Sequence, residues 1–189
     1  MVAGGPSAKD ADLAQVQGRC RVIAINNSVQ LAPWADILYA CDFAWWEKHA
    51  GSPDFHGLKL SVDRAASERQ WGVQLVGINK ADDRLELMKF GTVGWAGNSG
   101  FHCLNLAVQF LAAKIILVGF DMTVAHGLHW HGKHVGLNNP TDRNVARWRR
   151  CVDAAAEVID ALGIKVVNAS QISALQNYPK MSLEEALAC

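Results

Sequence analysis

The chain has 189 residues, of which half are hydrophobic and 19% are charged, and this composition is typical of a globular protein. Eighteen basic residues balance eighteen acidic ones, which argues against a general nucleic-acid-binding surface because such surfaces need an excess of positive charge. The start of the chain lacks the pattern of a signal peptide, and no apolar run approaches the ~18 residues of a membrane-spanning helix.

Short β-rich runs alternate with longer helical runs along the chain, a pattern that predicts parallel βαβ units. The first strand is very short, and a glycine-rich turn follows it directly. The second and third strands are apolar and end in polar residues. In the first half of the chain we expect strands at 1–3, 21–26, 35–42, 58–62 and 73–78, and helices at 10–17 and 43–49.

The second half begins with residues 80–90, which show no clear periodicity. The four glycines of 91–100 indicate a loop, and the apolar run 101–113 predicts a buried helix. Residues 114–121 form the clearest central strand of the sequence. A long, polar, histidine-rich loop is then expected over 122–139.

The C-terminal part carries helix boundary signals. Thr141 is placed to N-cap a helix that runs to about Leu162, where Gly163 ends it. A final strand is expected at 165–168, and Ser182 with Glu185 has the spacing of a capping box. The length fits one domain. We therefore predict an α/β fold, a single Rossmann-like three-layer domain over residues 1–189 with a mostly parallel sheet.

Four of the predicted strands end in a polar residue. In an open parallel sheet the ligand crevice lies at the carboxyl ends of the strands, so these side chains are in position to bind a ligand. Asparagine and aspartate also favour turns, and for any one of them this structural explanation has about equal weight. The coincidence of four favours a site: Asn26, Asp42, Asp121 and Asn168.

Two glycine-containing turns precede predicted helices, Gly4-Gly5-Pro6-Ser7 and Gly97-Asn98-Ser99-Gly100. Backbone N–H groups at the start of a helix can face a phosphate, and the two serines add hydroxyl donors. The first turn is neither a complete GxGxxG nor a Walker A motif. Taken alone, each turn is explained as well by an ordinary Gly-Pro turn or an ordinary N-cap.

Gly119-Phe120-Asp121 follows the central strand. The Asp121 carboxylate could bind a ribose hydroxyl, a metal or a substrate amine; the alternative is a turn aspartate that caps the next segment. Four of the seven histidines then lie within nine residues. We expect one of them to act as a general base. Zinc is the less favoured interpretation, because the segment has two glycines and no HExxH, and a solvent-exposed polar loop is the further alternative. These histidines are His126, His129, His131 and His134.

Two more groups of side chains are candidates for ligand contacts, although a solvated face and core packing are their ordinary explanations. The basic helix face can hold a phosphate, and the tryptophans can stack on a base or a sugar. Trp45 and Trp46 are adjacent on a predicted helix, so one should be buried and the other less so. The groups are Arg143, Arg147, Arg149 and Arg150, and Trp45, Trp46, Trp130 and Trp148.

The cysteines are widely spaced, odd in number and without a CxxC pair. Reduced thiols in a cytoplasmic protein are therefore expected. They are Cys20, Cys41, Cys103, Cys151 and Cys189.

The order of these motifs resembles that of a known group of proteins. The opening GGPSAKDADLAQVQGRCRVIAIN resembles the start of the bacterial lipooligosaccharide sialyltransferases and of the MptE-like 6-hydroxymethylpterin diphosphokinases. The segment GNSGFHCLNLAVQFLAAKIILVGFDM resembles their middle part. HWHG and NASQISALQNYPKMSLEEAL resemble the closing part of the MptE-like group, whereas residues 50–90 align with none of these. The compact size resembles that of phage-encoded members.

The resemblance implies two kinds of chemistry. The sialyltransferases use a CMP-sugar, and the likeness implies that Gly4, Gly5, Ser7, Asn26 and Ser99-Gly100 hold it. A late histidine acts as their general base, which implies His129 or His131 here. Met122 and Thr123 stand where those enzymes have paired tyrosines. The MptE-like proteins transfer diphosphate from ATP with Mg²⁺, which Asp42 and Asp121 would hold.

We therefore predict a nucleotide-sugar-dependent glycosyltransferase that takes a CMP-type donor and needs no metal. Mg²⁺-dependent diphosphate transfer from ATP and a non-catalytic nucleotide-binding module remain as alternatives. We expect a small-molecule nucleotide as partner, an acceptor still to be identified, compatibility with a homo-oligomer, and a location in the cytoplasm, that of the host for a phage-encoded protein. The expected catalytic residues are His129, His131 and Asp121, and the expected nucleotide-binding residues are Gly4, Gly5, Pro6, Ser7, Asn26, Asp42, Asn98, Ser99 and Gly100.

Overall fold

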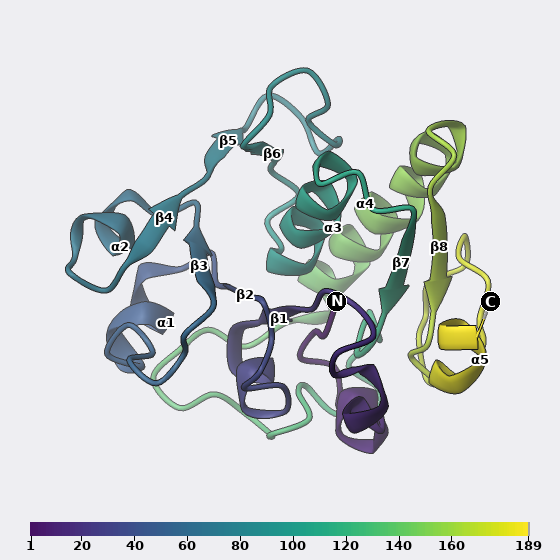
Figure 1. Cartoon of the computed structure of the whole chain (residues 1–189), viewed down its shortest axis with the longest axis horizontal. Helices are drawn as coiled ribbons and strands as arrows, with labels where there is room; N and C mark the ends of the chain where they lie inside the picture. The colour runs from purple at the N-terminus through teal and green to yellow at the C-terminus, as the bar shows by residue number, and fades with distance from the viewer. Residues whose placement is uncertain (189) are drawn as a thin grey trace.

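Parallel strands form the centre of the molecule in the computed structural model, which describes residues 1–188 (Figure 1). Four strands pair in chain order, and two further pairs of strands are also parallel. The α/β class with a mostly parallel sheet is thus confirmed. The four-stranded sheet consists of β1 (Ile23–Ile25), β2 (Ile37–Tyr39), β3 (Leu58–Ser61) and β4 (Val73–Leu75), and the pairs are β5 (Gly77–Asn79) with β6 (Thr92–Gly94) and β7 (Lys114–Leu117) with β8 (Lys165–Asn168).

Val2 joins the four-stranded sheet to the β7–β8 pair. Its backbone bridges Ala24 of β1 on one side and Val118, just after β7, on the other. The strand predicted at 1–3 is reduced to this bridge, but the bridge lies in the middle of the strand order β8–β7–Val2–β1–β2–β3–β4. The glycine turn that follows Val2 is therefore held between two strands.

Helices cover both faces of this layer of strands (Figure 1). Ile23 and Ile25 of β1 pack in one core cluster with residues of α3 and α4, whereas Ala24 between them packs in a second cluster with residues of α1 and α5. This alternation is the ordinary consequence of side chains pointing to opposite faces along a strand. The helices are α1 (Phe43–Lys48), α2 (Arg64–Glu68), α3 (Ser99–Gln109), α4 (Asp142–Ala161) and α5 (Leu183–Ala188), with short 3-10 helices at Pro6–Asp10, Leu13–Val16 and Asn26–Gln30.

Several predicted boundaries are correct. Thr141 accepts a hydrogen bond from the Asn144 N–H in a capping box at the start of α4, and Gly163 has a φ of 74° just after that helix. The predicted Ser182–Glu185 capping box is also present, because the Ser182 N–H donates to the Glu185 carboxylate and the Glu185 N–H donates to the Ser182 hydroxyl.

Other predicted elements are wrong. The helix expected at 10–17 is two short 3-10 turns, and the strand expected at 73–78 divides into β4 and β5, which belong to different sheets. The loop expected at 91–100 contains β6, whose residues are buried. In the last two cases local composition suggested one element, and strand pairing with another segment decided a different one.

The segment 80–90, which has no legible periodicity, is held by polar side chains of α3. Asn105 is fully buried, and its Oδ1 accepts hydrogen bonds from the N–H groups of Glu86 (2.8 Å) and Gly94 (2.9 Å), while its Nδ2 donates to the Glu86 carbonyl (2.9 Å). Gln109 bonds the Glu86 and Thr92 carbonyls as well. The backbone of this segment is therefore satisfied by side chains of a helix that follows it in sequence.

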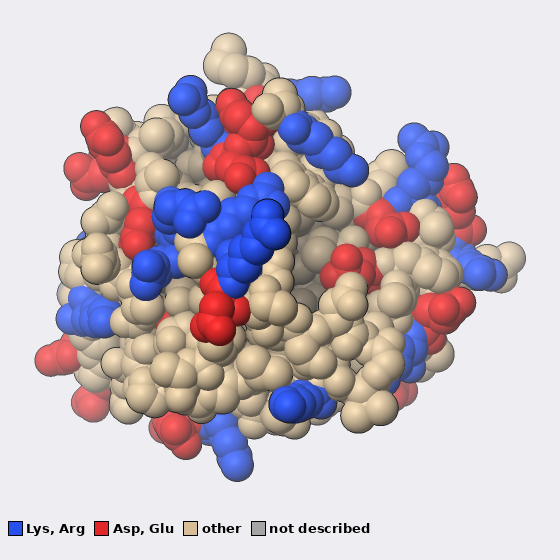
Figure 2. All heavy atoms as spheres, turned by 180° about the vertical axis from the view of Figure 1, so that it is seen from behind, with Lys and Arg blue, Asp and Glu red and all other residues tan. Residues whose placement is uncertain are grey.

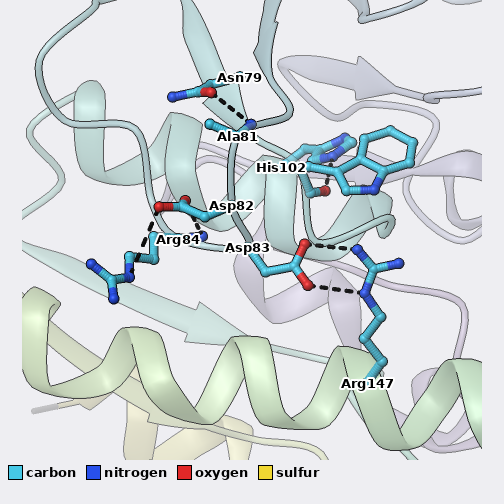
Figure 3. Close-up of polar contacts among 8 residues, drawn as sticks. Asn79, Ala81, Asp82, Asp83, Arg84, His102 and Arg147 are labelled. Carbon is cyan, nitrogen blue, oxygen red and sulfur yellow. Dashed lines mark hydrogen bonds and ion pairs between the residues drawn. The ribbon is translucent and has the colours of Figure 1, made fainter.

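The same segment is tied to α4 by an ion pair. The Asp83 carboxylate accepts two hydrogen bonds from Arg147, at 3.0 and 2.7 Å, in a bidentate arrangement (Figure 3). Arg147 therefore has a partner in the loop and does not form part of the wall of the large cavity described below. Arg143, Arg149 and Arg150 are exposed and also lie outside that wall.

Candidate functional site

A cavity of about 870 Å³ lies at the carboxyl ends of β1, β2 and β7, where a parallel sheet places its ligand crevice. Ten of the twelve residues predicted for the site form part of its wall. Pro6 and Ser7 do not, and the strand-end residue Asn168 is buried away from it, where its Oδ1 accepts from the Ser170 N–H. The ten are Gly4, Gly5, Asn26, Asp42, Asn98, Ser99, Gly100, Asp121, His129 and His131.

The first glycine turn packs backbone against backbone with the turn after β7. The Gly5 N–H donates to the Gly119 carbonyl at 2.9 Å. A Cβ on Gly5 would lie 2.5 Å from that carbonyl oxygen and 2.6 Å from Oδ2 of Asp121, distances that no side chain tolerates. Glycine is therefore required at position 5 because Gly119 and Asp121 approach so closely.

Ser7 binds Asp121 instead of facing the cavity. Its backbone N–H donates to Oδ2 of Asp121 at 2.8 Å, and its hydroxyl donates to Oδ1. Burial raises the pKa of the Asp121 carboxyl, and the two hydrogen bonds from Ser7 oppose that change by stabilising the charged form. The predicted phosphate contact of Ser7 is thus replaced by a role in holding Asp121 at the base of the cavity.

The Asp121 turn is also held from the far side of β7, by residues that the sequence did not single out. Ser170 accepts from the Phe120 N–H at 2.8 Å, and Ser173 donates to the Phe120 carbonyl at 2.6 Å. The Ala174 N–H donates to the Asp121 carbonyl at 2.7 Å. These three residues follow β8, so only the pairing of β7 with β8 brings them to the turn.

The second glycine turn opens α3 at the cavity wall. Asn98 caps the helix by accepting a hydrogen bond from the Phe101 N–H at 3.0 Å. Ser99 and Gly100 occupy the first turn, in which N–H groups have no acceptor within the helix. Both residues line the cavity, and the positive end of the helix dipole lies with them.

Asn26 and Asp42 stand at the ends of β1 and β2. Asn26 has a φ of 53°, a left-handed conformation that asparagine tolerates better than most residues. Asp42 is exposed at the cavity, and the neighbouring Cys41 thiol lies 3.3 Å from its Oδ2. Burial and the Asp42 charge raise the pKa of Cys41 to about 12, so this thiol stays protonated and is not a nucleophile.

Two tryptophans contribute to the wall, Trp45 and Trp148. The expectation that only one of Trp45 and Trp46 is buried is wrong, because their exposed fractions are 3% and 0%. The Trp45 indole donates to Oδ1 of Asn27 at 2.7 Å and meets Trp46 edge to face. Trp148 of α4 is half-buried and remains the more accessible ring.

Three histidines of the 122–139 loop gather at one side of the cavity. His129, His131 and His134 each present a ring nitrogen, and these nitrogens all lie within 4.8 Å of one another. The ring centroids are 4.5 to 5.0 Å apart, with His129 and His131 stacked almost parallel. His126 is exposed and outside this group. His134 was absent from the predicted site residues, although its spacing from His131 was a usable signal.

The imidazole rings of the three histidines are uncharged near neutral pH. Burial and the neighbouring rings lower the pKa of His129 to about 4, and burial is also the main cause that lowers the pKa values of His131 and His134. The rings are therefore uncharged near neutral pH, the form in which imidazole accepts a proton or binds a metal. Nε2 of His129 is buried without a hydrogen-bond partner.

Acidic and basic side chains are interspersed over the face seen in Figure 2, with basic groups gathered near its middle. No helix of residues 1–188 combines the length and the apolar character that crossing a membrane requires. Comparison with known proteins found no matching family model, no similar curated protein and no similar solved structure.

Proposed function

We propose that this chain binds a nucleotide in the cavity at the strand ends and transfers a glycosyl group from a CMP-type sugar nucleotide. The observation that carries the proposal is the convergence of both glycine turns, Asn26, Asp121 and a histidine cluster on one cavity of about 870 Å³. A volume of this size accommodates a sugar nucleotide. The resemblance to sialyltransferases adds the choice of donor.

The phosphate end of the donor is assigned to the start of α3. Ser99 and Gly100 offer first-turn N–H groups, and a helix N-terminus attracts an anion through its dipole. Asn26 also lines the cavity and adds an amide donor. The half-buried ring of Trp148 provides a surface on which a base or a sugar can stack.

His131 is the ring best suited to activate the acceptor. His129, with a pKa of about 4, is a weak base, whereas His131 lies less deeply buried on the same wall. In the transfer, the acceptor hydroxyl gives its proton to His131 while its oxygen bonds to the anomeric carbon. The bond from that carbon to the phosphate oxygen breaks, and CMP leaves with its charge facing the α3 N-terminus.

Mg²⁺-dependent diphosphate transfer from ATP is a second candidate, favoured by the presence of Asp42 and Asp121 on one cavity. Mg²⁺ commonly uses one or two carboxylates together with substrate phosphates. Both oxygens of Asp121 already accept from Ser7, which leaves Asp42 as the freer ligand. This candidate predicts that ATP stabilises the protein only with Mg²⁺ and that Asp42→Asn removes the effect.

A melting-temperature panel tests the proposal. CMP and CMP-sugars should raise the melting temperature with EDTA present, because a ligand that binds only the folded state stabilises it by mass action. Ser99→Ala should reduce the shift, whereas Ser67→Ala, at a half-buried serine of α2 outside the cavity wall, should leave it unchanged. No shift with any nucleotide at millimolar concentration would exclude both candidates. A shift without turnover that His131→Ala leaves intact would favour the non-catalytic module.

A further inference from the structure

We propose that His129, His131 and His134 form a binding site for one divalent transition-metal ion of the zinc class. The proposal goes beyond the nucleotide function, since it concerns the histidine cluster and not the α3 N-terminus. The sequence of the segment disfavours zinc, because it has two glycines and no HExxH motif to provide a fixed scaffold. The structure supplies that scaffold and brings the three rings together.

The first support is the spacing of the ligand atoms. Three nitrogens bound to one tetrahedral zinc ion at 2.0–2.1 Å lie about 3.3 Å from one another. The ring nitrogens of the three histidines already lie within 4.8 Å of one another, so closing by about 1.5 Å at most completes the geometry. Rotations of side chains are sufficient for such a change, with no rearrangement of the backbone.

The second support is the orientation of His129. Nδ1 of its ring faces Gly4, 3.2 Å from where a Gly4 Cβ would lie. Nε2 is buried and has no partner. Metal-binding histidines usually bond a backbone carbonyl or a carboxylate through the nitrogen that does not bind the ion. Nδ1 of His129 lies beside the Gly4 backbone as this arrangement requires, and a metal would satisfy the unpartnered Nε2.

The third support is the rigidity of the loop around the rings. The Trp130 N–H donates to the Gly4 carbonyl at 3.0 Å, which fixes the segment to the first glycine turn. Asn139 bonds both the N–H and the carbonyl of His134, at 2.8 and 3.0 Å. Gly132, with a φ of 86°, turns the chain between His131 and His134, and its N–H donates to the His129 carbonyl. The glycine is therefore part of the scaffold.

The donor set selects the class of metal. Three imidazoles suit zinc, copper or nickel, whereas magnesium and calcium need oxygen ligands. Lys48, whose charge acts on His131 and His134, is bonded to the Val135 carbonyl at 2.5 Å. All three histidines line the cavity, so a fourth coordination position would open toward it, as in zinc sites that act on a substrate. With the ion bound, His131 would be a ligand and would no longer be free to act as a base, and hydroxide on the ion would supply that function.

The test is a calorimetric titration of the metal-free full-length chain with ZnCl₂. We expect one equivalent to bind with a Kd of about 1 μM or below. His131→Ala and His134→Ala should each weaken binding by at least about 100-fold, because each removes a direct ligand. His126→Ala is the matched control, an exposed histidine of the same loop, and should leave the affinity unchanged.

Co²⁺ provides a second readout, because the visible spectrum of the bound ion reports a tetrahedral site, and the two histidine variants should abolish it. Circular dichroism of each variant shows whether it has folded. Absence of Zn²⁺ binding by the folded wild type would overturn the proposal, and so would binding that survives both His131→Ala and His134→Ala. Nucleotide shifts measured in EDTA are independent of this result, so either proposal can fail alone.

Discussion

At the scale of single residues, a side chain at Gly4 and a side chain at Gly5 would meet different neighbours. A Cβ on Gly5 would meet the Gly119 carbonyl and the Asp121 carboxylate, whereas a Cβ on Gly4 would meet only the His129 ring at 3.2 Å. Backbone atoms of a packed turn move less readily than the end of a side chain. Position 5 therefore matters for stability, and position 4 for the place of His129.

Gly5→Ala should lower the free energy of unfolding by about 2 kcal/mol or more, the scale of overpacking a dense core. Gly4→Ala should cost less than half of that, because His129 can shift. Chemical denaturation of the two variants measures the difference. Equal costs would show that the turn does not pack against Asp121 in the way described.

His102 is a second residue with a specific expectation. It is fully buried, its Nε2 donates to the Trp95 carbonyl at 2.6 Å, and its Nδ1 accepts from the Tyr39 hydroxyl at 2.8 Å, an arrangement that requires a neutral ring. Burial lowers the pKa of His102 to about 4, below the ordinary value of 6.5. The unfolded state thus binds a proton first as the pH falls.

The stability contributed by neutral His102 is therefore complete above pH 6.5 and is lost between pH 6.5 and about 4. Within that window the free energy of unfolding should fall by up to about 1.4 kcal/mol per pH unit from this residue. Denaturation curves of the wild type and His102→Gln between pH 7 and 5 isolate the contribution. A wild type no more sensitive to acid than the variant would contradict the assignment.

At the scale of elements, α3 packs through its apolar side chains and also uses polar groups at two places. Its first turn faces the cavity, and Asn105 and Gln109 on its later turns bind the segment 80–91. Asn105 satisfies two backbone N–H groups and one carbonyl. This helix therefore connects the cavity wall to the part of the chain that has the least regular structure.

Asn105→Leu keeps the side-chain size but leaves the N–H groups of Glu86 and Gly94 unpaired in a buried place. The free energy of unfolding should fall by about 3 kcal/mol, since each orphaned buried group costs about 1–3 kcal/mol. Gln70→Leu, at an exposed glutamine, is the control and should change little. A cost near zero for Asn105→Leu would mean that segment 80–91 does not depend on α3.

The elements also show what the sequence could and could not predict. The residue spacing at Thr141 and Ser182 correctly predicts their capping boxes. The positions of Asn26, Asp42 and Asp121 after predicted strands correctly place all three at one cavity. Asn105 and Ser170 contact residues that are distant in the chain, and patterns of neighbouring residues therefore do not predict these contacts. Spacing groups His134 with the other histidines, but the contacts of Gly4 and Asn139 that orient the loop do not follow from that spacing.

At the scale of the whole molecule, the central position of Val2 connects the parts of the site. The bridge to β1 and to Val118 places the first glycine turn beside the Asp121 turn, and the Gly4 carbonyl holds the histidine loop through Trp130. The wall of the cavity therefore presents amides and a helix N-terminus as well as imidazoles. Such a combination suits a ligand that carries both an anionic group and a reacting group.

The central claim is that a nucleotide binds in this cavity, and an NMR titration of the isotope-labelled chain with CMP tests it most directly. We expect the backbone amide resonances of Gly4, Ser99 and Gly100 to shift together and saturate with one Kd, while those of α2, which lies outside the cavity wall, stay in place. Absence of any shift at saturating CMP, or shifts confined to residues outside the cavity wall, would contradict it.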